Sequence, residues 1–205
     1  MATVDVMRLP SAERHEPAHR FDYKGQHRYL VTLPTHKGKT LFTDGDRVFG
    51  ILGILRQQAA AHRFDVYAYC FLPDRLLLII RGREETSDMK EFLAGFRGGS
   101  NDIVTRLDQH PAWSRKYIER VLRKGEESRD IARQLLLAPV KEGLAKSPSE
   151  YPYLGSFVVP VEKLLATKPP VRPPARDKRK PFPPGRTRQS KSAPFRQRDR
   201  FRRNH

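Results

Sequence analysis

The sequence predicts an α+β fold, in which helices back an antiparallel sheet of about four to five strands. Three observations support this prediction. Short β-rich runs alternate with longer runs of helical periodicity, a proline turn joins two apolar runs as a hairpin, and turn residues separate the runs. The expected order of elements is βαββαβα.

The first strand and the first helix are predicted between residues 27 and 62. Residues 27–33, HRYLVTL, form the strand because β-branched and aromatic residues dominate them. Thr43 or Asp44 can cap the helix, which ends near His62. Its apolar residues recur at helical spacing: Val48, Ile51, Leu52, Leu55 and Ala59.

A β-hairpin is predicted next. Residues 64–72, FDVYAYCFL, alternate in polarity, which places one set of side chains on a common face: Phe64, Val66, Ala68 and Cys70. Pro73-Asp74 forms the turn, and residues 76–80 return as a buried strand.

The second long helix is predicted from residue 87 to residue 107. Thr86 or Ser87 can cap it, and the Gly98-Gly99 pair is its expected weak point. One face carries the apolar residues Met89, Phe92, Leu93, Phe96, Ile103, Val104 and Leu107.

A short strand and a third helix complete the folded part. The strand is KYIERVLR, residues 116–123, and the helix starts near Glu126. Pro139 disfavours helical geometry at Ala138 and so ends this helix. The result is a sandwich of the ferredoxin-like or RRM-like type, and sheets of this type often bind nucleic acid, although fold alone does not define function.

The chain of 205 residues is strongly basic, and its charge is concentrated at one end. The net charge is +17, and residues 168–205 hold 14 Lys and Arg against two Asp, a net of +12 that leaves +5 for the remainder. Eight of the 17 prolines lie in the same segment. Such a composition cannot bury enough apolar surface to offset the entropy of ordering. We therefore expect a disordered segment at 1–21, one folded domain at 22–165 and a disordered Pro/Arg/Lys-rich tail at 166–205.

The composition also narrows the compartment and the partners. No apolar run approaches the roughly 20 residues that span a bilayer, and the N-terminus lacks the features of a signal peptide. Cys70 is the only cysteine, which excludes an internal disulfide and a cysteine zinc cluster. The expectation is a cytoplasmic protein without a membrane span, with polyanions as partners.

Four sequence segments, in their order and spacing, resemble the single-strand tyrosine transposases of the HUH superfamily, and most of all the REP-associated tyrosine transposases. The segments are YLVTLPTHKGKTLF, FDVYAYCFLPDRLLLII, AWSRKYIERVLRKGEESRDIARQLLLAPVKEGLA and SEYPYLGS. The most specific residues are Trp113, Arg115, Tyr117, Arg120, Val121, Leu122, Pro139, Val140, Lys141, Gly143, Leu144, Tyr151 and Pro152. The resemblance covers roughly residues 27–156.

The resemblance implies two chemical devices. One is a histidine pair after a Leu-Pro turn, whose i and i+2 side chains share a strand face and hold one divalent metal that polarises the scissile phosphate. The other is a tyrosine on a helix, shortly before the Pro-Val-Lys motif. This tyrosine attacks the phosphate and becomes covalently linked to the DNA.

This sequence departs from the family at all three catalytic positions. Leu72-Pro73 matches the turn, so Arg75 and Leu77 occupy the histidine positions, and Gln134 occupies the tyrosine position. Arg75 has no lone pair to donate, Leu77 is apolar, and an amide is no nucleophile. We therefore expect no catalytic residue, no metal and no other cofactor, although the activity of the family is transposition.

Other residues are weak substitutes. His15 and His19 have the spacing of a helical metal pair but lie in a region without helical periodicity. His27 and His36 flank the first strand as surface residues. Tyr117 is expected to be structural, and Cys70 to be a small buried hydrophobe.

Three hypotheses remain. The first is a nucleic-acid-binding protein derived from a transposase, without cleavage, whose partner is hairpin or single-stranded DNA or structured RNA. Its expected binding residues are Arg75, Arg115, Arg120, Lys141, Lys178, Arg179, Lys180, Arg186 and Arg188, with base stacking by Trp113, Tyr117 or Phe96 as a weaker expectation. The second is an active transposase with an unusual site. The third is an assembly factor associated with ribosomes or proteins. Homodimer formation and association with the nucleoid or the ribosome stay open.

Overall fold

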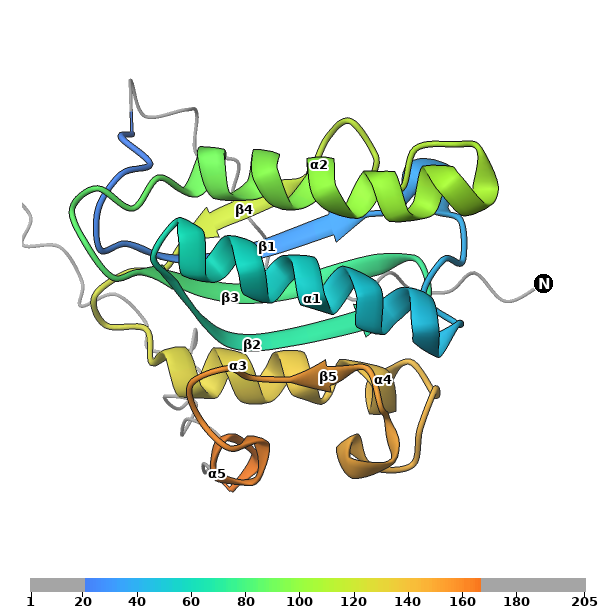
Figure 1. Cartoon of the computed structure of the whole chain (residues 1–205). Coiled ribbons are helices and arrows are strands. Elements are labelled where there is room, and N and C mark those ends of the chain that lie inside the picture. Colours follow the sequence, from blue (N-terminus) through green and yellow to red (C-terminus); the bar gives the residue numbers. More distant parts are fainter. Residues whose placement is uncertain (1–20, 167–205) are drawn as a thin grey trace, which may run out of the picture. The chain divides into compact units, whose positions relative to one another are not determined.

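The computed structural model describes residues 21–166, which form a five-stranded sheet with helices on both faces (Figure 1). The strands are β1 (Arg28–Pro34), β2 (Phe64–Leu72), β3 (Arg75–Gly82), β4 (Ile118–Val121) and β5 (Leu154–Gly155). The helices are α1 (Gly45–Ala61), α2 (Met89–Asp108), α3 (Ser128–Leu136), α4 (Ala138–Lys141) and α5 (Val161–Leu165), with 3-10 turns η1 (His36–Gly38) and η2 (Pro148–Glu150). The sheet order is β4-β1-β3-β2-β5, and every pair is antiparallel.

The first face of the sheet packs against α1 and α2, the two long helices in front of the sheet in Figure 1. Alternate residues of the central strands point to this face because side chains of a strand alternate between its two sides. From β1 they are Tyr29, Val31 and Leu33, and from β3 they are Leu76, Leu78 and Ile80. All six are at most 1% exposed, so this face forms the main core.

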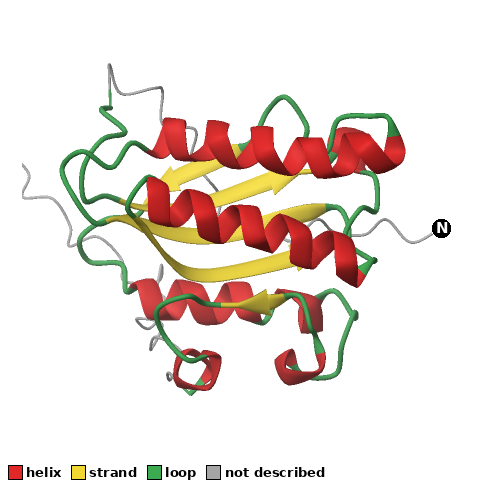
Figure 2. Cartoon of the chain, viewed as in Figure 1, coloured by secondary structure: helices red, strands yellow, loops and turns green. Residues whose placement is uncertain are grey.

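The second face packs against α3, α4 and α5 (Figure 2). Ile79 and Leu77 of β3 point here, and Cys70 of β2 lies beside them. Leu135 and Leu136 of α3 complete this second cluster. The three helical segments thus cover the side of the hairpin where Arg75 and Leu77 lie.

The β-hairpin has the predicted turn, but β2 contains a β-bulge that changes its side-chain alternation. The register shifts between Val66 and Ala68, which oppose consecutive residues of β3, so Tyr67 is the extra residue. Phe64 packs in the first cluster, whereas Ala68 and Cys70 pack in the second. The prediction that all four alternating residues share one face was therefore wrong from Ala68 onward.

The caps of the long helices agree only in part with the prediction. Asp44 caps α1 as expected and accepts a hydrogen bond from Asp46 N at 3.0 Å. For α2 the cap is Asp88, which accepts from two backbone N–H groups at 2.9 and 3.1 Å. The predicted cap Ser87 instead donates its hydroxyl proton to Arg63 O at 2.9 Å. An ionised carboxylate is the better partner for the positive end of a helix, which explains the choice of Asp88.

The Gly98-Gly99 pair does not interrupt α2, which is continuous over 20 residues. Glycine serves helix packing here instead. A Cβ on Gly95 would lie 2.2 Å from Gln58 Oε1, and one on Gly99 would lie 3.0 Å from Ile54 Cγ2. Both partners belong to α1, so the two glycines let α1 and α2 approach closely.

The end of α3 agrees only in part with the prediction from Pro139: the third helix stops before the proline, but Ala138, where helical geometry was expected to be disfavoured, is itself helical. The helix ends at Leu136, and α4 begins at Ala138 with Pro139 in its first turn, where a missing N–H group costs nothing. The prediction missed β5 and α5, which carry only two and five residues. The expected disordered segments at 1–21 and 166–205 fall almost entirely outside the described residues.

Candidate functional site

The turn between β2 and β3 presents two positions to the second face of the sheet. Arg75 is the first residue of β3, and Leu77 follows two residues later on the same side. Ile79 continues this row and is fully buried. Arg75, Leu77 and Ile79 thus form one row on the second face, and the first two are the positions at which the sequence resemblance implies a histidine pair.

Arg75 is held between two carboxylates. Its Nη1 donates to Asp74 Oδ1 at 2.6 Å, and its Nη2 donates to Glu142 Oε1. Glu142 directly follows α4, so this ion pair joins the hairpin turn to the helical layer on the second face. One guanidinium charge faces two carboxylate charges, which leaves the cluster with a net charge of −1.

Leu77 lies in apolar surroundings. It packs against the second cluster, where Cys70, Leu136 and Ala138 are buried. Burial, followed by the charge of Glu142, raises the pKa of the Cys70 thiol, so the thiol stays protonated at neutral pH. Neither Arg75 nor Leu77 can donate an electron pair to a metal, and a divalent metal does not fit this position.

Gln134 lies half-buried on α3, two residues before Leu136. On the Cys70–Glu142 side of the hairpin, the contacts identify the tyrosine Tyr151, which donates its hydroxyl proton to Phe71 O at 2.7 Å. Burial, followed by the proximity of Cys70, Tyr153 and Glu142, raises the pKa of Tyr151. A phenol that has a raised pKa, and whose hydroxyl proton is already donated to a backbone carbonyl, is poorly prepared for nucleophilic attack.

The predicted binding cations fall into three groups. Arg115 and Lys141 are exposed and have no ion pair with the described residues. Arg75 and Arg120 are each held by a carboxylate, with Arg120 Nη1 bonded to Glu126 Oε1 at 2.5 Å. The tail residues lie outside the described residues: Lys178, Arg179, Lys180, Arg186 and Arg188.

The predicted stacking aromatics are mostly core residues. Phe96 is fully buried, and Trp113 is 5% exposed and donates its indole N–H to Ser100 Oγ at 2.8 Å. Neither ring has a free face for a base. Tyr117 is half-buried beside the guanidinium of Arg97, 5.6 Å from its ring centroid. Its expected structural role agrees with this position.

Sequence reasoning missed two features of the site. The first is Glu142, because its pairing with Arg75 spans 67 residues of sequence and no local pattern indicates it. The second is the loop after β1, whose lysines Lys37 and Lys39 line a surface depression. The cluster of basic residues in HKGK could have indicated this loop.

Histidines and membrane segments add no further site. Within residues 21–166 there is no group of three His, Cys, Asp or Glu side chains that could hold a metal ion. His15, His19 and His205 lie outside this range. None of the described helices has the length and apolar character needed to cross a bilayer.

The antiparallel sheet, the two long helices on one face and the proline hairpin define a transposase-like α+β fold. The structure of a REP-associated tyrosine transposase bound to a REP hairpin has this fold, with a TM-score of 0.55 and 18% sequence identity. The match covers 66% of this chain and 79% of that chain. The predicted fold is confirmed.

Two further solved structures are more distant. A protein assigned as a transposase from Deinococcus radiodurans R1 has a TM-score of 0.42 and 18% identity, over 58% of this chain and 95% of its own. A bacterial tRNA(His) guanylyltransferase-like protein in complex with ATP has a TM-score of 0.42 and 12% identity, over 63% of each chain. These scores are too low to support a conclusion. A scan against protein-family models and a search of curated proteins found no match.

Proposed function

We propose that this chain binds nucleic acid with a transposase fold and does not cleave it. The observation that carries the proposal is the Arg75–Glu142 ion pair, at a position where the family resemblance implies a metal histidine. The ion pair at Arg75 and the apolar contact at Leu77 support a site without a reactive centre.

The absence of cleavage follows from the chemistry of three side chains. Phosphodiester cleavage in the family needs a Lewis acid on the phosphate and a tyrosine hydroxyl as nucleophile. Arg75 and Leu77 offer no metal ligand, and Gln134 offers no hydroxyl. Asp74 and Glu142 also leave the position negatively charged, which repels a phosphate.

Binding is supported by charge rather than by the old reactive centre. Among the predicted cations of the described part, Arg115 and Lys141 are free to meet phosphates. The tail at 168–205 adds a net charge of +12. The REP-associated transposase with the same fold was solved with a REP hairpin, so a stem-loop with an adjacent single strand is the first ligand to test for this chain.

The test uses the full chain with a labelled DNA stem-loop that carries a single-stranded overhang, and with the RNA of the same sequence. Fluorescence anisotropy measures binding, and denaturing gels with magnesium or manganese measure cleavage and covalent adducts. We expect binding without cleavage and without an adduct. Cleavage by the unmodified chain would support the active-transposase alternative and refute the proposal.

A nuclease-treated pull-down separates the remaining alternative. If partners captured by the full chain are lost after nuclease treatment, nucleic acid mediates the association. If neither oligonucleotide binds and protein partners survive the nuclease, the chain is an assembly factor and the proposal fails.

A further inference from the structure

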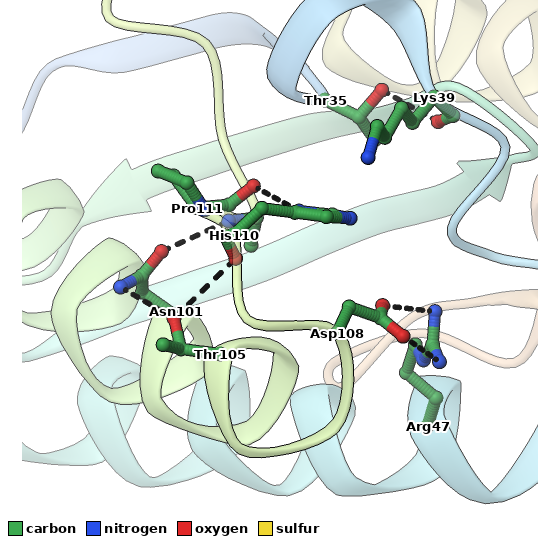
Figure 3. A network of polar contacts seen from close by, with 9 residues as sticks. Thr35, Lys39, Arg47, Asn101, Thr105, Asp108, His110 and Pro111 are labelled. Atoms are coloured by element: carbon green, nitrogen blue, oxygen red, sulfur yellow. Dashed lines mark hydrogen bonds and ion pairs between the residues drawn. The ribbon is translucent and has the colours of Figure 1, made fainter.

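A depression lined mainly by charged side chains lies beside the loop between β1 and α1. Its volume of about 660 Å³ lies in the range of small-ligand sites, about 300–1,000 Å³. Three segments line it: the loop with Lys37 and Lys39, α1 with Arg47, and the end of α2 with Asp108 and His110. Figure 3 shows four of these residues, Lys39, Arg47, Asp108 and His110.

The loop is tightly closed by its own hydrogen bonds. Thr35 Oγ1 donates to Lys39 O at 2.7 Å, and Gly38 N donates to Thr35 O at 3.2 Å. Lys37 and Gly38 both have left-handed backbone geometry, with φ of 56° and 68°. This geometry turns the chain sharply and leaves the side chains of Lys37 and Lys39 exposed at the rim. The shape of the rim is therefore set by the backbone, independently of a ligand.

The wall opposite the loop is neutral and well anchored. Arg47 Nη1 and Nη2 approach the two carboxylate oxygens of Asp108 at 2.9 and 3.2 Å (Figure 3). Their side chains are only 16% and 26% exposed, so water screens this pair weakly. Arg47 and Asp108 cancel each other, and the net charge of the depression comes from the remaining cationic groups.

Those groups lie near His36, and the one carboxylate among the described residues that line the depression, Asp108, is already paired with Arg47. Lys37, Lys39 and Arg115 have no ion pair in residues 21–166, and the His36 and His110 rings stack with centroids 6.3 Å apart. Desolvation, followed by the charges of Lys37, His110, Lys39 and Arg115, lowers the pKa of His36 below its ordinary value. Cations that repel one another at a concave site are stabilised by a bound anion.

We propose that this depression is a phosphate-binding site that holds the backbone of the nucleic acid. The proposal rests on the proposed function and names the surface that carries it. Lys37 and Lys39 meet phosphate oxygens from the loop, and Arg115 approaches from the segment before β4. Phosphate contacts position a strand without reading its bases, so this site sets the register and not the sequence preference.

The location of the loop connects the site to the hairpin turn. Thr35 N donates to Asp74 O at 2.9 Å, and His36 N donates to Ala112 O at 2.9 Å. The loop, the turn and the end of α2 thus meet at one end of the sheet (right in Figure 1). A strand held at the depression lies next to the Asp74–Arg75–Glu142 cluster, whose net negative charge favours the depression for phosphates.

The test compares variants of the full chain that lack one or two lysines. Lys37→Ala/Lys39→Ala should lose two phosphate contacts on a DNA stem-loop with a single-stranded overhang. At about 0.7 per contact, the slope of log affinity against log salt should fall by about 1.4, which is roughly a ten- to thirtyfold loss at about 0.1 M salt. Unfolding temperatures should stay unchanged because both side chains are exposed.

Two matched single variants each remove one lysine, at opposite ends of the sheet. Lys124 is exposed and follows β4, whose Val121 pairs with Tyr29 at the start of β1, far from the loop. Lys39→Ala should reduce the slope, and Lys124→Ala should not. If the two variants and the unmodified chain have equal slopes, the phosphate site is refuted, but the proposed function stands as long as the unmodified chain binds. If the unmodified chain binds neither oligonucleotide, the proposed function is refuted instead.

Nuclear magnetic resonance distinguishes free phosphate from a nucleic-acid backbone. Inorganic phosphate and the stem-loop are added separately to the full chain, and the amide signals of residues 36–40 are followed. Shifts with both ligands support a general phosphate site, and shifts with the stem-loop alone support a site for the polymer. The absence of shifts with either ligand overturns the proposal.

Discussion

The guanidinium of Arg75 and the carboxylate of Glu142 form an ion pair across 67 residues of sequence. The pair connects the β2–β3 turn to the residue that ends α4. Both side chains are less than a third exposed. The contact thus fixes the third layer of the molecule against the hairpin.

The first prediction concerns the strength of this pair. A double-mutant cycle with Arg75→Met and Glu142→Gln should give a coupling free energy of about 0.5–1 kcal/mol, measured by denaturant unfolding of the full chain. The pair Arg63–Glu84 serves as a control, because its side chains are 54% and 48% exposed. The same cycle there should give a coupling close to zero. Additive effects at Arg75 and Glu142 would show that the pair does not hold the layers together.

The second prediction concerns cleavage. Restoring Arg75→His, Leu77→His and Gln134→Tyr together should allow metal-dependent adduct formation with the DNA stem-loop, whereas each single change should leave the chain inactive. The reason is that metal and nucleophile are both needed. Gels with magnesium or manganese measure the adduct. An adduct formed by the unmodified chain and lost in Tyr151→Phe or Tyr117→Phe would contradict the prediction.

The third prediction concerns the tail. Residues 168–205 carry +12 against +5 for the rest, so the tail should supply most of the salt dependence of binding. If about six of its cations meet single-strand phosphates, the tail contributes about −4 to the slope of log affinity against log salt. A 1–167 fragment should show a flatter slope and weaker binding to every sequence, but keep any preference for a particular hairpin. Equal slopes would show that the tail takes no part.

The fourth prediction concerns pH. Burial alone would raise the pKa of Glu126, but hydrogen bonds from Arg120 and from Arg123 N outweigh it and lower the pKa below 4.5. A carboxylate whose pKa is lowered by folding stabilises the folded state at pH values above its unfolded-state pKa. This stabilisation is lost as the pH falls through its folded-state pKa. Glu126→Gln should therefore be less stable than the unmodified chain at neutral pH, by at most about 1 kcal/mol because the pair is partly exposed.

The same substitution has a second readout. The difference in the free energy of unfolding should shrink below pH of about 4.5 and vanish in stronger acid. Glu126→Gln also frees the charge of Arg120, so nucleic-acid binding should strengthen slightly. A stability difference that persists unchanged in acid would show that the ion pair is not its source.

Local patterns predicted the regular elements well because caps, turns and periodicity act over a few residues. Asp44 marks the start of a helix in the sequence and in the structure, and α3 ends shortly before Pro139. The bulge at Tyr67 escaped prediction because a strand with alternating residues reads the same until its partner strand sets the register.

The side-chain partners in the site were beyond sequence reasoning. Arg75 reads as a free cation until Glu142 is placed beside it, and Trp113 reads as a stacking aromatic until Ser100 accepts its N–H group. The depression around Lys37 likewise needs the end of α2, which is about 70 residues away in sequence. Contacts of this kind depend on how elements pack, and no single element contains them.

Leu77 packs against the second cluster, so this position contributes to the stability of the fold as well as to any site at the hairpin turn. Returning a histidine to this position alone would place a polar ring in apolar surroundings, at a cost of roughly 1–3 kcal/mol. No metal would bind to offset that cost, because Arg75, which has no lone pair to donate, would still occupy the other position. Leu77→His taken singly should therefore lower the stability of the chain without creating a metal site, so packing of the second face restricts which side chains this position can carry.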